Sequence, residues 1–194
     1  MQTYPDTHHD TSSNTIFGFW LYLLTDCVMF AAFFAAFAVL RDATYGGPGA
    51  AELLDTRQTL IETMILLTSS FACGIAMLFA KSRRKGPLLG WLALAWVLAG
   101  LFLGMEIADF LTLVRGGNGW ERNAFLSSYF TLVGLHGLHI AVGLLFAAVF
   151  AVQLSVVGFA DKVLRRLVCL RMYWHFLYFI WIFTFAIVYL MGGK

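Results

Sequence analysis

The chain has 194 residues, of which 60% are hydrophobic and 12% are charged, and its formal net charge is +2. Soluble domains carry about 25% charged residues, so the composition excludes an ordinary water-soluble protein and indicates an integral membrane protein. The small net charge gives no indication of nucleic acid as a partner. The three cysteines form no Cys-x-x-Cys pair, so a disulfide framework or a thiolate metal site is not expected.

Five apolar runs are long enough to cross a membrane, which takes about 20 residues of helix. In chain order they cover about residues 16–40, 60–80, 88–114, 125–157 and 167–191. A polar tail, residues 1–15, precedes the first run, and a Gly/Pro turn at 46–49 leads into a short amphipathic piece. We therefore predict an all-α integral membrane bundle, with the tail followed by one five-helix transmembrane domain over residues 16–194.

Lysine and arginine are unequally divided between the two ends of the predicted bundle. Cytoplasmic loops are enriched in these residues. One end holds eight of them: Lys81, Arg83, Arg84, Lys85, Lys162, Arg165, Arg166 and Arg171. The other end holds five: Arg41, Arg57, Arg115, Arg122 and Lys194. This distribution predicts a cytoplasmic N-terminus and a periplasmic C-terminus.

Seven acidic or histidine side chains fall within the apolar runs, where such groups are costly and usually face other protein. A rise of 1.5 Å per residue places Asp26 and His136 near the midplane, and Glu62 and Glu106 near the outer ends of their helices. The set is Asp26, Glu62, Glu106, Asp109, His136, His139 and His175.

The segment GLHGLHIAVG, residues 134–143, places two histidines on one face of a helix. They could bind a b-type haem together with His175, or they could hydrogen-bond to a neighbouring helix that the glycines allow to approach closely. The chain has no Glu-x-x-His pair and no His-Glu-x-x-His motif. Contact between helices is therefore favoured, and no metal site is predicted.

The acidic residues also have two interpretations each. A lone carboxyl such as Asp26 is either protonated or paired, and both states can serve a proton path. A neutral Asp26 that only joins two helices is the alternative. Glu62 and Glu106 could meet a lipid headgroup, water or an arginine such as Arg57. The aromatic stripe from Tyr173 to Trp181 is expected to pack in the bundle or face lipid.

Four segments in order resemble subunit III of the haem–copper respiratory oxidases, and most closely its bo-type, ubiquinol-oxidising branch. They are GFWLYLLTDCVMFAAFFAAFAVL, GWLALAWVLAGLFLGMEIADF, FTLVGLHGLHIAVGLL and YWHFLYFIWIFTFAIVYLMGG, and the resemblance covers the chain from Phe17 to Gly193. The resemblance places motif residues at Asp26, Glu106, His136, His139, Trp174 and His175. Tyr178 stands where the family commonly has an aspartate.

The resemblance implies a non-catalytic subunit of a proton-pumping oxidase in the bacterial inner membrane. Its partners would be subunit I as the main contact, subunits II and IV, and phospholipids, with ubiquinol as the substrate of the complex. Haem b, haem o and copper would lie in subunit I, and this chain would hold none of them. It would support assembly and sustained proton uptake, and the lipid-binding residues would be Arg57, Glu62, Glu106 and Trp174.

Three alternatives remain at this point. The chain could be subunit III of a cytochrome c oxidase, which the resemblance does not exclude because the electron donor binds elsewhere in such complexes. It could also be a small membrane cytochrome with bis-histidine haem, or a proton-coupled transporter that uses Asp26. The absence of an internal repeat weakens the transporter interpretation.

Overall fold

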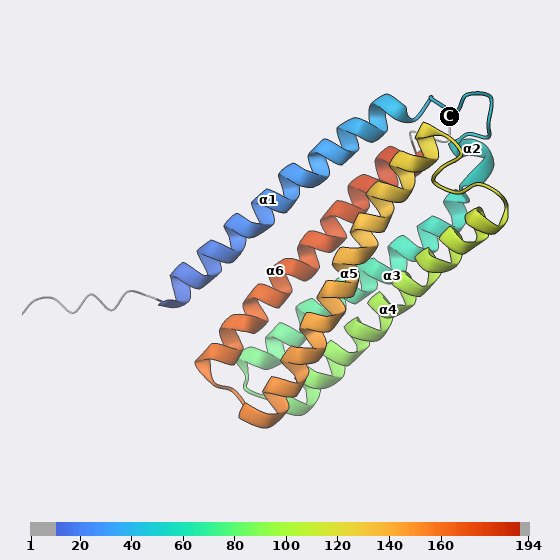
Figure 1. Cartoon of the computed structure of the whole chain (residues 1–194). Helices are drawn as coiled ribbons and strands as arrows, with labels where there is room; N and C mark the ends of the chain where they lie inside the picture. Colours follow the sequence, from blue (N-terminus) through green and yellow to red (C-terminus); the bar gives the residue numbers. More distant parts are fainter. Residues whose placement is uncertain (1–10, 191–194) are drawn as a thin grey trace, which may run out of the picture.

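The computed structural model describes residues 11–190, without the side chains of residues 11–13, 51 and 161 (Figure 1). Within this range five long helices are apolar enough to span a membrane, and no strand is assigned, so the predicted all-α membrane bundle is confirmed. The elements are α1 (Thr11–Leu40), α2 (Ala50–Leu53), α3 (Thr56–Lys81), α4 (Lys85–Arg115), α5 (Ala124–Val157), α6 (Asp161–Thr184) and the π-helix η1 (Phe185–Leu190).

The observed helices extend beyond the apolar runs that predicted them. The first helix begins at Thr11 rather than near residue 16, and α6 begins at Asp161, six residues before the predicted start at residue 167. The first turns of α6 are rich in charge, yet Val163 and Leu167 are buried in them, so hydropathy alone does not mark the start. Residues 1–10 of the expected tail, residue 191 of the last predicted segment and residues 192–194 after it lie outside the described range.

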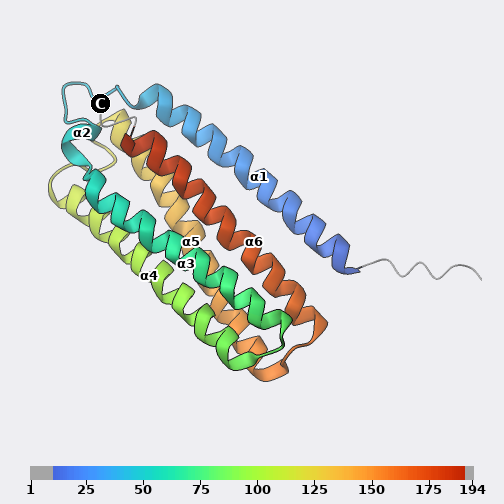
Figure 2. The same cartoon turned by 180° about the vertical axis from the view of Figure 1, so that it is seen from behind.

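Four of the long helices form an antiparallel bundle, and the remaining one, α1, packs against the outside of this bundle. Helices α3, α4, α5 and α6 contact one another in a ring, while α1 packs against α5 and α6 (Figures 1 and 2). Only 22% of the most apolar stretch of α1 is buried, against 50% for α3. Helix α1 is therefore peripheral, and α3 is central.

The connections divide the bundle into two chemically different ends. The α3–α4 and α5–α6 connections lie at one end, and α2 and the end of α1 lie at the other (Figures 1 and 2). The first end carries the Lys81–Lys85 and Lys162–Arg166 groups of basic residues. At the opposite end two side chains cap helices by accepting backbone N–H groups: Asp55 at the start of α3 and Asn123 at the start of α5.

The interior consists of two clusters of buried apolar side chains, one in each half of the bundle. We call the half nearer α2 the outer half and the half nearer the α3–α4 connection the inner half. The cluster in the outer half includes Phe30 and Phe37 of α1 with Phe102, Phe125 and Trp181. The cluster in the inner half is made mainly of alanine and leucine from α3 to α6, and its aromatic members include Phe150 and Trp174. Helix α1 contributes only to the outer cluster, so its attachment depends on that half.

Polar side chains on α3 join neighbouring helices at membrane depth. The indole N–H of Trp174 on α6 donates to Ser69 Oγ at 3.0 Å, and this hydroxyl donates to the Ala95 carbonyl of α4 at 2.7 Å. In the other half, Trp181 Nε1 donates to Thr63 Oγ1 at 3.0 Å. Both tryptophans are at least 97% buried. These bonds hold α6 against α3 where lipid tails offer no alternative partner.

The π-helix η1 continues α6 and positions Tyr189. A π-helix has a wider turn than an α-helix, and it often occurs at functional sites. The Tyr189 hydroxyl lies 3.0 Å from the Tyr129 hydroxyl of α5, and both residues are buried. One hydroxyl donates to the other, so the acceptor keeps an O–H that it can donate elsewhere.

The Ser69 bridge gives a prediction for stability. Ser69→Ala removes the acceptor of Trp174 and one bond to α4, and it is expected to lower the free energy of unfolding by about 1–2 kcal/mol. Thr68→Ala is the control, because Thr68 is exposed and bonds only within its own helix. Unfolding in mixed detergent micelles measures both variants. Equal losses would show that the bridge adds nothing to stability.

Candidate functional site

Asp26 and His139 meet between α1 and α5. Asp26 is 8% exposed, and its Oδ2 lies 3.8 Å from His139 Nε2 and has no hydrogen-bond partner among the described residues. The other contact between an acidic and a basic side chain among the described residues joins Arg41 to Asp42 and lies at the surface. The acidic residue of α1 therefore faces His139 inside the bundle, with Tyr22 and Tyr173 as further titratable neighbours.

The hydrogen bonds of His139 limit where protons can reside in this pair. His139 Nδ1 lies 2.8 Å from the Leu135 carbonyl, which can only accept, so Nδ1 carries a hydrogen. In a neutral ring Nε2 is then an unprotonated acceptor directed at Asp26. At 3.8 Å the two groups are not hydrogen-bonded, and a proton can reside on the carboxyl or on Nε2.

His136 is buried among aromatic rings and connects α5 to α6. Its ring is completely buried, stacks on Trp181 with centroids 5.0 Å apart, and meets Phe102 edge-on. Nε2 donates to the Leu177 carbonyl of α6 at 3.1 Å, and Nδ1 has no partner among the described residues. The two histidines of the GLHGLH segment thus contact different helices. His136 joins α5 to α6, and His139 faces α1.

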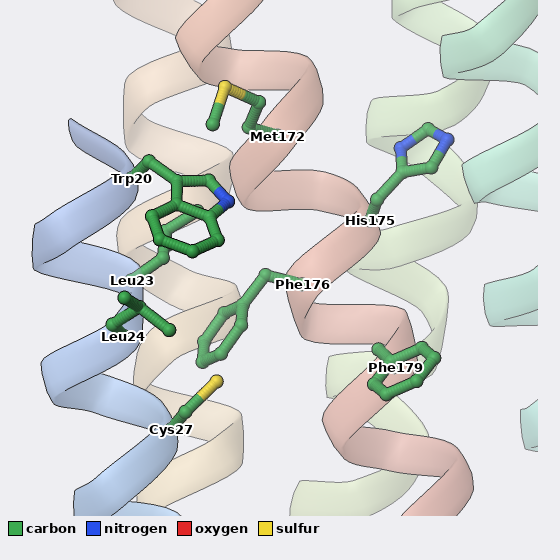
Figure 3. Close-up of a pocket in the computed structure, with 8 residues that line it drawn as sticks. All are labelled: Trp20, Leu23, Leu24, Cys27, Met172, His175, Phe176 and Phe179. Atoms are coloured by element: carbon green, nitrogen blue, oxygen red, sulfur yellow. The ribbon is translucent and has the colours of Figure 1, made fainter. Parts of the chain in front are cut away.

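His175 is exposed and does not approach His136. It lines an apolar cavity of about 400 Å³ between α1 and α6. Figure 3 shows Trp20 and Cys27 of α1 across from Phe176 of α6, with the His175 ring turned away from the two α1 side chains. His175 Nδ1 lies 3.0 Å from the carbonyl of Arg171 one turn earlier. The facing pair of histidines that a bis-histidine haem requires is not formed by His136 and His175.

Three carboxyl groups gather in the outer half of α3 and α4. The Gln58 amide donates to both Glu62 and Asp109, and Glu106 is an electrostatic neighbour of these two acids. Glu62 is completely buried and Glu106 is 4% exposed, while Asp109 lines a polar cavity of about 170 Å³ with Tyr129. No lysine, arginine or histidine within the described range lies within 4 Å of these carboxyls.

The residues expected to bind lipid do not form one site. Arg57 is exposed in the first turn of α3, in the same half as Glu62 and Glu106. Trp174 belongs to the buried cluster of the inner half, where its indole N–H donates to Ser69.

Tyr178, at the family's aspartate position, is half-buried and makes no hydrogen bond to the described residues. Over residues 11–190 there is no group of three or more His, Cys, Asp or Glu side chains able to hold a metal ion.

Sequence reasoning missed the polar residues of α3 and their partners. Gln58, Thr63 and Ser69 were not singled out, although each bonds to another helix. The available signal was spacing, because the buried polar positions of α3 are separated by three, four or seven residues, which places them on one helical face. They are Thr59, Glu62, Thr63, Ser69 and Ser70.

Comparison with known proteins identifies relatives over almost the whole chain. Residues 2–193 match the family model described as cytochrome c oxidase subunit III. The chain is 48% identical to a protein of Pseudomonas aeruginosa named cytochrome bo(3) ubiquinol oxidase subunit 3, covering 97% of this chain and 90% of the relative. Identity is 42% to the protein of the same name in Pseudomonas putida, covering 95% and 89%. It is 37% to cytochrome c oxidase subunit 3 of Bacillus sp. PS3, covering 92% and 86%.

Gly143 of the GLHGLHIAVG segment provides a prediction about the α5–α6 contact. A Cβ at Gly143 would lie 3.0 Å from the Tyr173 ring, whose hydroxyl donates to the His139 carbonyl. Gly143→Ala is therefore expected to destabilise the protein by about 1–3 kcal/mol. Gly100→Ala, where a Cβ meets nothing within 4 Å, should instead gain up to about 1 kcal/mol. Thermal unfolding in detergent compares them, and a neutral Gly143→Ala would contradict the tight contact.

Proposed function

The chain belongs to the cytochrome c oxidase subunit III family, and from this premise we propose that it is the third subunit of a proton-pumping bo-type ubiquinol oxidase. The observation that carries the proposal is the match of residues 2–193 to the family, together with relatives at 48% and 42% identity that are named as ubiquinol oxidase subunits. The named cytochrome c oxidase relative is less similar, at 37%. These identities favour quinol over cytochrome c as the electron donor.

In the proposed complex the chain is a non-catalytic subunit of the bacterial inner membrane. Subunit I holds haem b, haem o and copper and reduces dioxygen, and subunits II and IV complete the assembly. The contacts of His136 support a packing role, because its Nε2–H is occupied by the Leu177 carbonyl. The transmembrane helices would lie with the Lys81–Lys85 end in the cytoplasm, as the charge distribution predicts.

The Asp26–His139 pair is the proposed contribution of this chain to proton uptake. The two groups lie 3.8 Å apart, and one proton can reside on either of them. Asp26 is on the peripheral helix α1, which contacts the bundle through α5 and α6. The pair would hold a proton at membrane depth and pass it toward subunit I during turnover.

Phospholipid is the second proposed partner. The cavity between α1 and α6 is lined by Trp20, Leu24, Met172 and Phe179, and its apolar walls suit an acyl chain (Figure 3). Arg57 does not line this cavity; exposed in the first turn of α3, it would meet a headgroup phosphate at that end of the bundle. A lipid in the cavity would fill the space beside α1 and stabilise its attachment.

Co-purification tests the proposed function directly. In mild detergent, the tagged chain should bring with it a larger subunit that contains haem and copper, and the complex should oxidise ubiquinol. The chain purified alone should show no Soret band. A Soret band from the isolated chain would favour the bis-histidine cytochrome instead, and purification without any oxidase subunit would favour the transporter.

A variant of Asp26 tests the proton role. Asp26→Asn keeps the shape of the side chain but cannot ionise, so the complex should assemble with an unchanged haem spectrum and lose turnover rate or durability during turnover. Asp42→Asn is the matched control, since Asp42 is exposed and pairs with Arg41. Loss of the haem signal in Asp26→Asn would show that Asp26 is structural, and unchanged turnover and durability would contradict the proton role.

A further inference from the structure

The outward faces of α4 and α5 enclose a groove in the outer half of the bundle. Its volume is about 310 Å³ and its lining is almost entirely apolar. Leu103 and Phe110 of α4 form one wall, and Gly134, Gly137 and Ala141 of α5 form much of the other. Small residues on a membrane helix allow another helix to approach its backbone closely. The groove opens on the membrane side of the α4–α5 pair.

Glu106 is the polar side chain of this groove. The residue is 4% exposed and lines the cavity, and its Oε2 lies 3.9 Å from the position of a Cβ on Gly137. It makes no hydrogen bond or ion pair with the residues that the structure describes. Its electrostatic neighbours are two acids, Glu62 and Asp109, and two tyrosines, Tyr129 and Tyr189, whose hydroxyls bond to each other. Glu106 is thus an almost buried carboxyl that accepts no hydrogen bond from the described residues of its own chain.

Such a carboxyl is costly if only lipid covers it. Lipid tails offer no hydrogen-bond donor, and a polar group left unsatisfied in hydrocarbon costs several kcal/mol. Gln58, the nearest amide donor of the cluster, is already directed at Glu62 and Asp109. A donor from outside the chain would remove this cost, and the groove is the route by which it can reach Glu106.

A second groove continues along the same two helices in the inner half. It has a volume of about 390 Å³ and is lined by Ala93 and Trp96 of α4 and by Ala147, Ala148 and Ala151 of α5. The two grooves span α4 from Leu89 to Phe110, a length of about 32 Å at 1.5 Å per residue. This length matches the ~30 Å hydrocarbon core. The small-residue surface therefore extends over the length that one membrane-spanning helix would occupy.

We propose that the α4–α5 face receives a transmembrane helix of another oxidase subunit, which presents a hydrogen-bond donor to Glu106. The proposal rests on the proposed function, because it assumes an oxidase complex. A helix fits better than an acyl chain, since an acyl chain offers no donor to Glu106. A hydroxyl, an amide or a basic group on the partner helix would meet this requirement.

Site-specific photocrosslinking in the purified complex tests this inference. Benzoylphenylalanine is placed at Leu138, which lines the groove and is 60% exposed. The matched control is Phe71 of α3, which is 67% exposed. Leu138 lies 14 residues from the outer start of α5, and Phe71 lies 15 residues from the outer start of α3. The two probes therefore sample similar depths on different faces.

The expected result is an adduct between the Leu138 probe and a membrane-spanning segment of another subunit, located by mass spectrometry, with no protein adduct from Phe71. Adducts with lipid only, adducts with a second copy of this chain, or equal protein adducts at both positions would each overturn the inference. If the chain does not co-purify with a haem-containing subunit, the proposed function fails as well. Co-purification without the Leu138 adduct overturns this inference alone.

Substitution of Glu106 tests the role of the carboxyl. Glu106→Gln keeps a hydrogen-bonding side chain of the same length, so the Leu138 adduct should form in nearly full yield. Glu106→Leu removes the acceptor, and the adduct should be lost at detergent concentrations at which the Glu106→Gln complex retains it. Equal retention in the two variants would show that no donor on the partner meets Glu106.

Discussion

The absence of hydrogen-bond partners in lipid determines how this bundle is built. Every polar side chain at membrane depth must find its partner within protein, and α3, the most buried helix, supplies several of these partners. Thr63 and Ser69 each receive a tryptophan N–H from α6. The position of α6 therefore follows from two directional bonds as well as from apolar packing, and His136, Tyr173 and Tyr189 on the facing surfaces add further bonds between α5 and the α6–η1 helix.

The membrane-spanning helices could be predicted because hydrophobic length alone decides them, whereas the pairing of polar groups could not. The rise per residue gives the depth of a side chain but not the direction in which it points. Asp26 and His136 were placed at the same depth, yet it is His139, one turn further along α5, that faces α1. Depth did group Glu62 with Glu106 correctly, but the amide of Gln58, which joins Glu62 to Asp109, carries no signal in hydropathy.

The tryptophans illustrate the same limit. The stripe from Tyr173 to Trp181 was expected to pack or to face lipid, and composition does not distinguish these roles from donation to another helix. The hydroxyl that accepts from Trp174 is 105 residues away in the chain, so only the folded bundle brings the two together. The position of Tyr189 depends on the π-helix η1, for which the sequence offers no recognisable pattern.

The peripheral position of α1 has a consequence for the carboxyl that it carries. Asp26 and His139 belong to parts of the molecule that can separate without breaking the ring formed by α3, α4, α5 and α6. A small outward tilt of α1 would move the carboxyl away from the imidazole, while the four remaining helices stay in register. The distance between the two groups is thus coupled mechanically to the packing of α1 against α5 and α6.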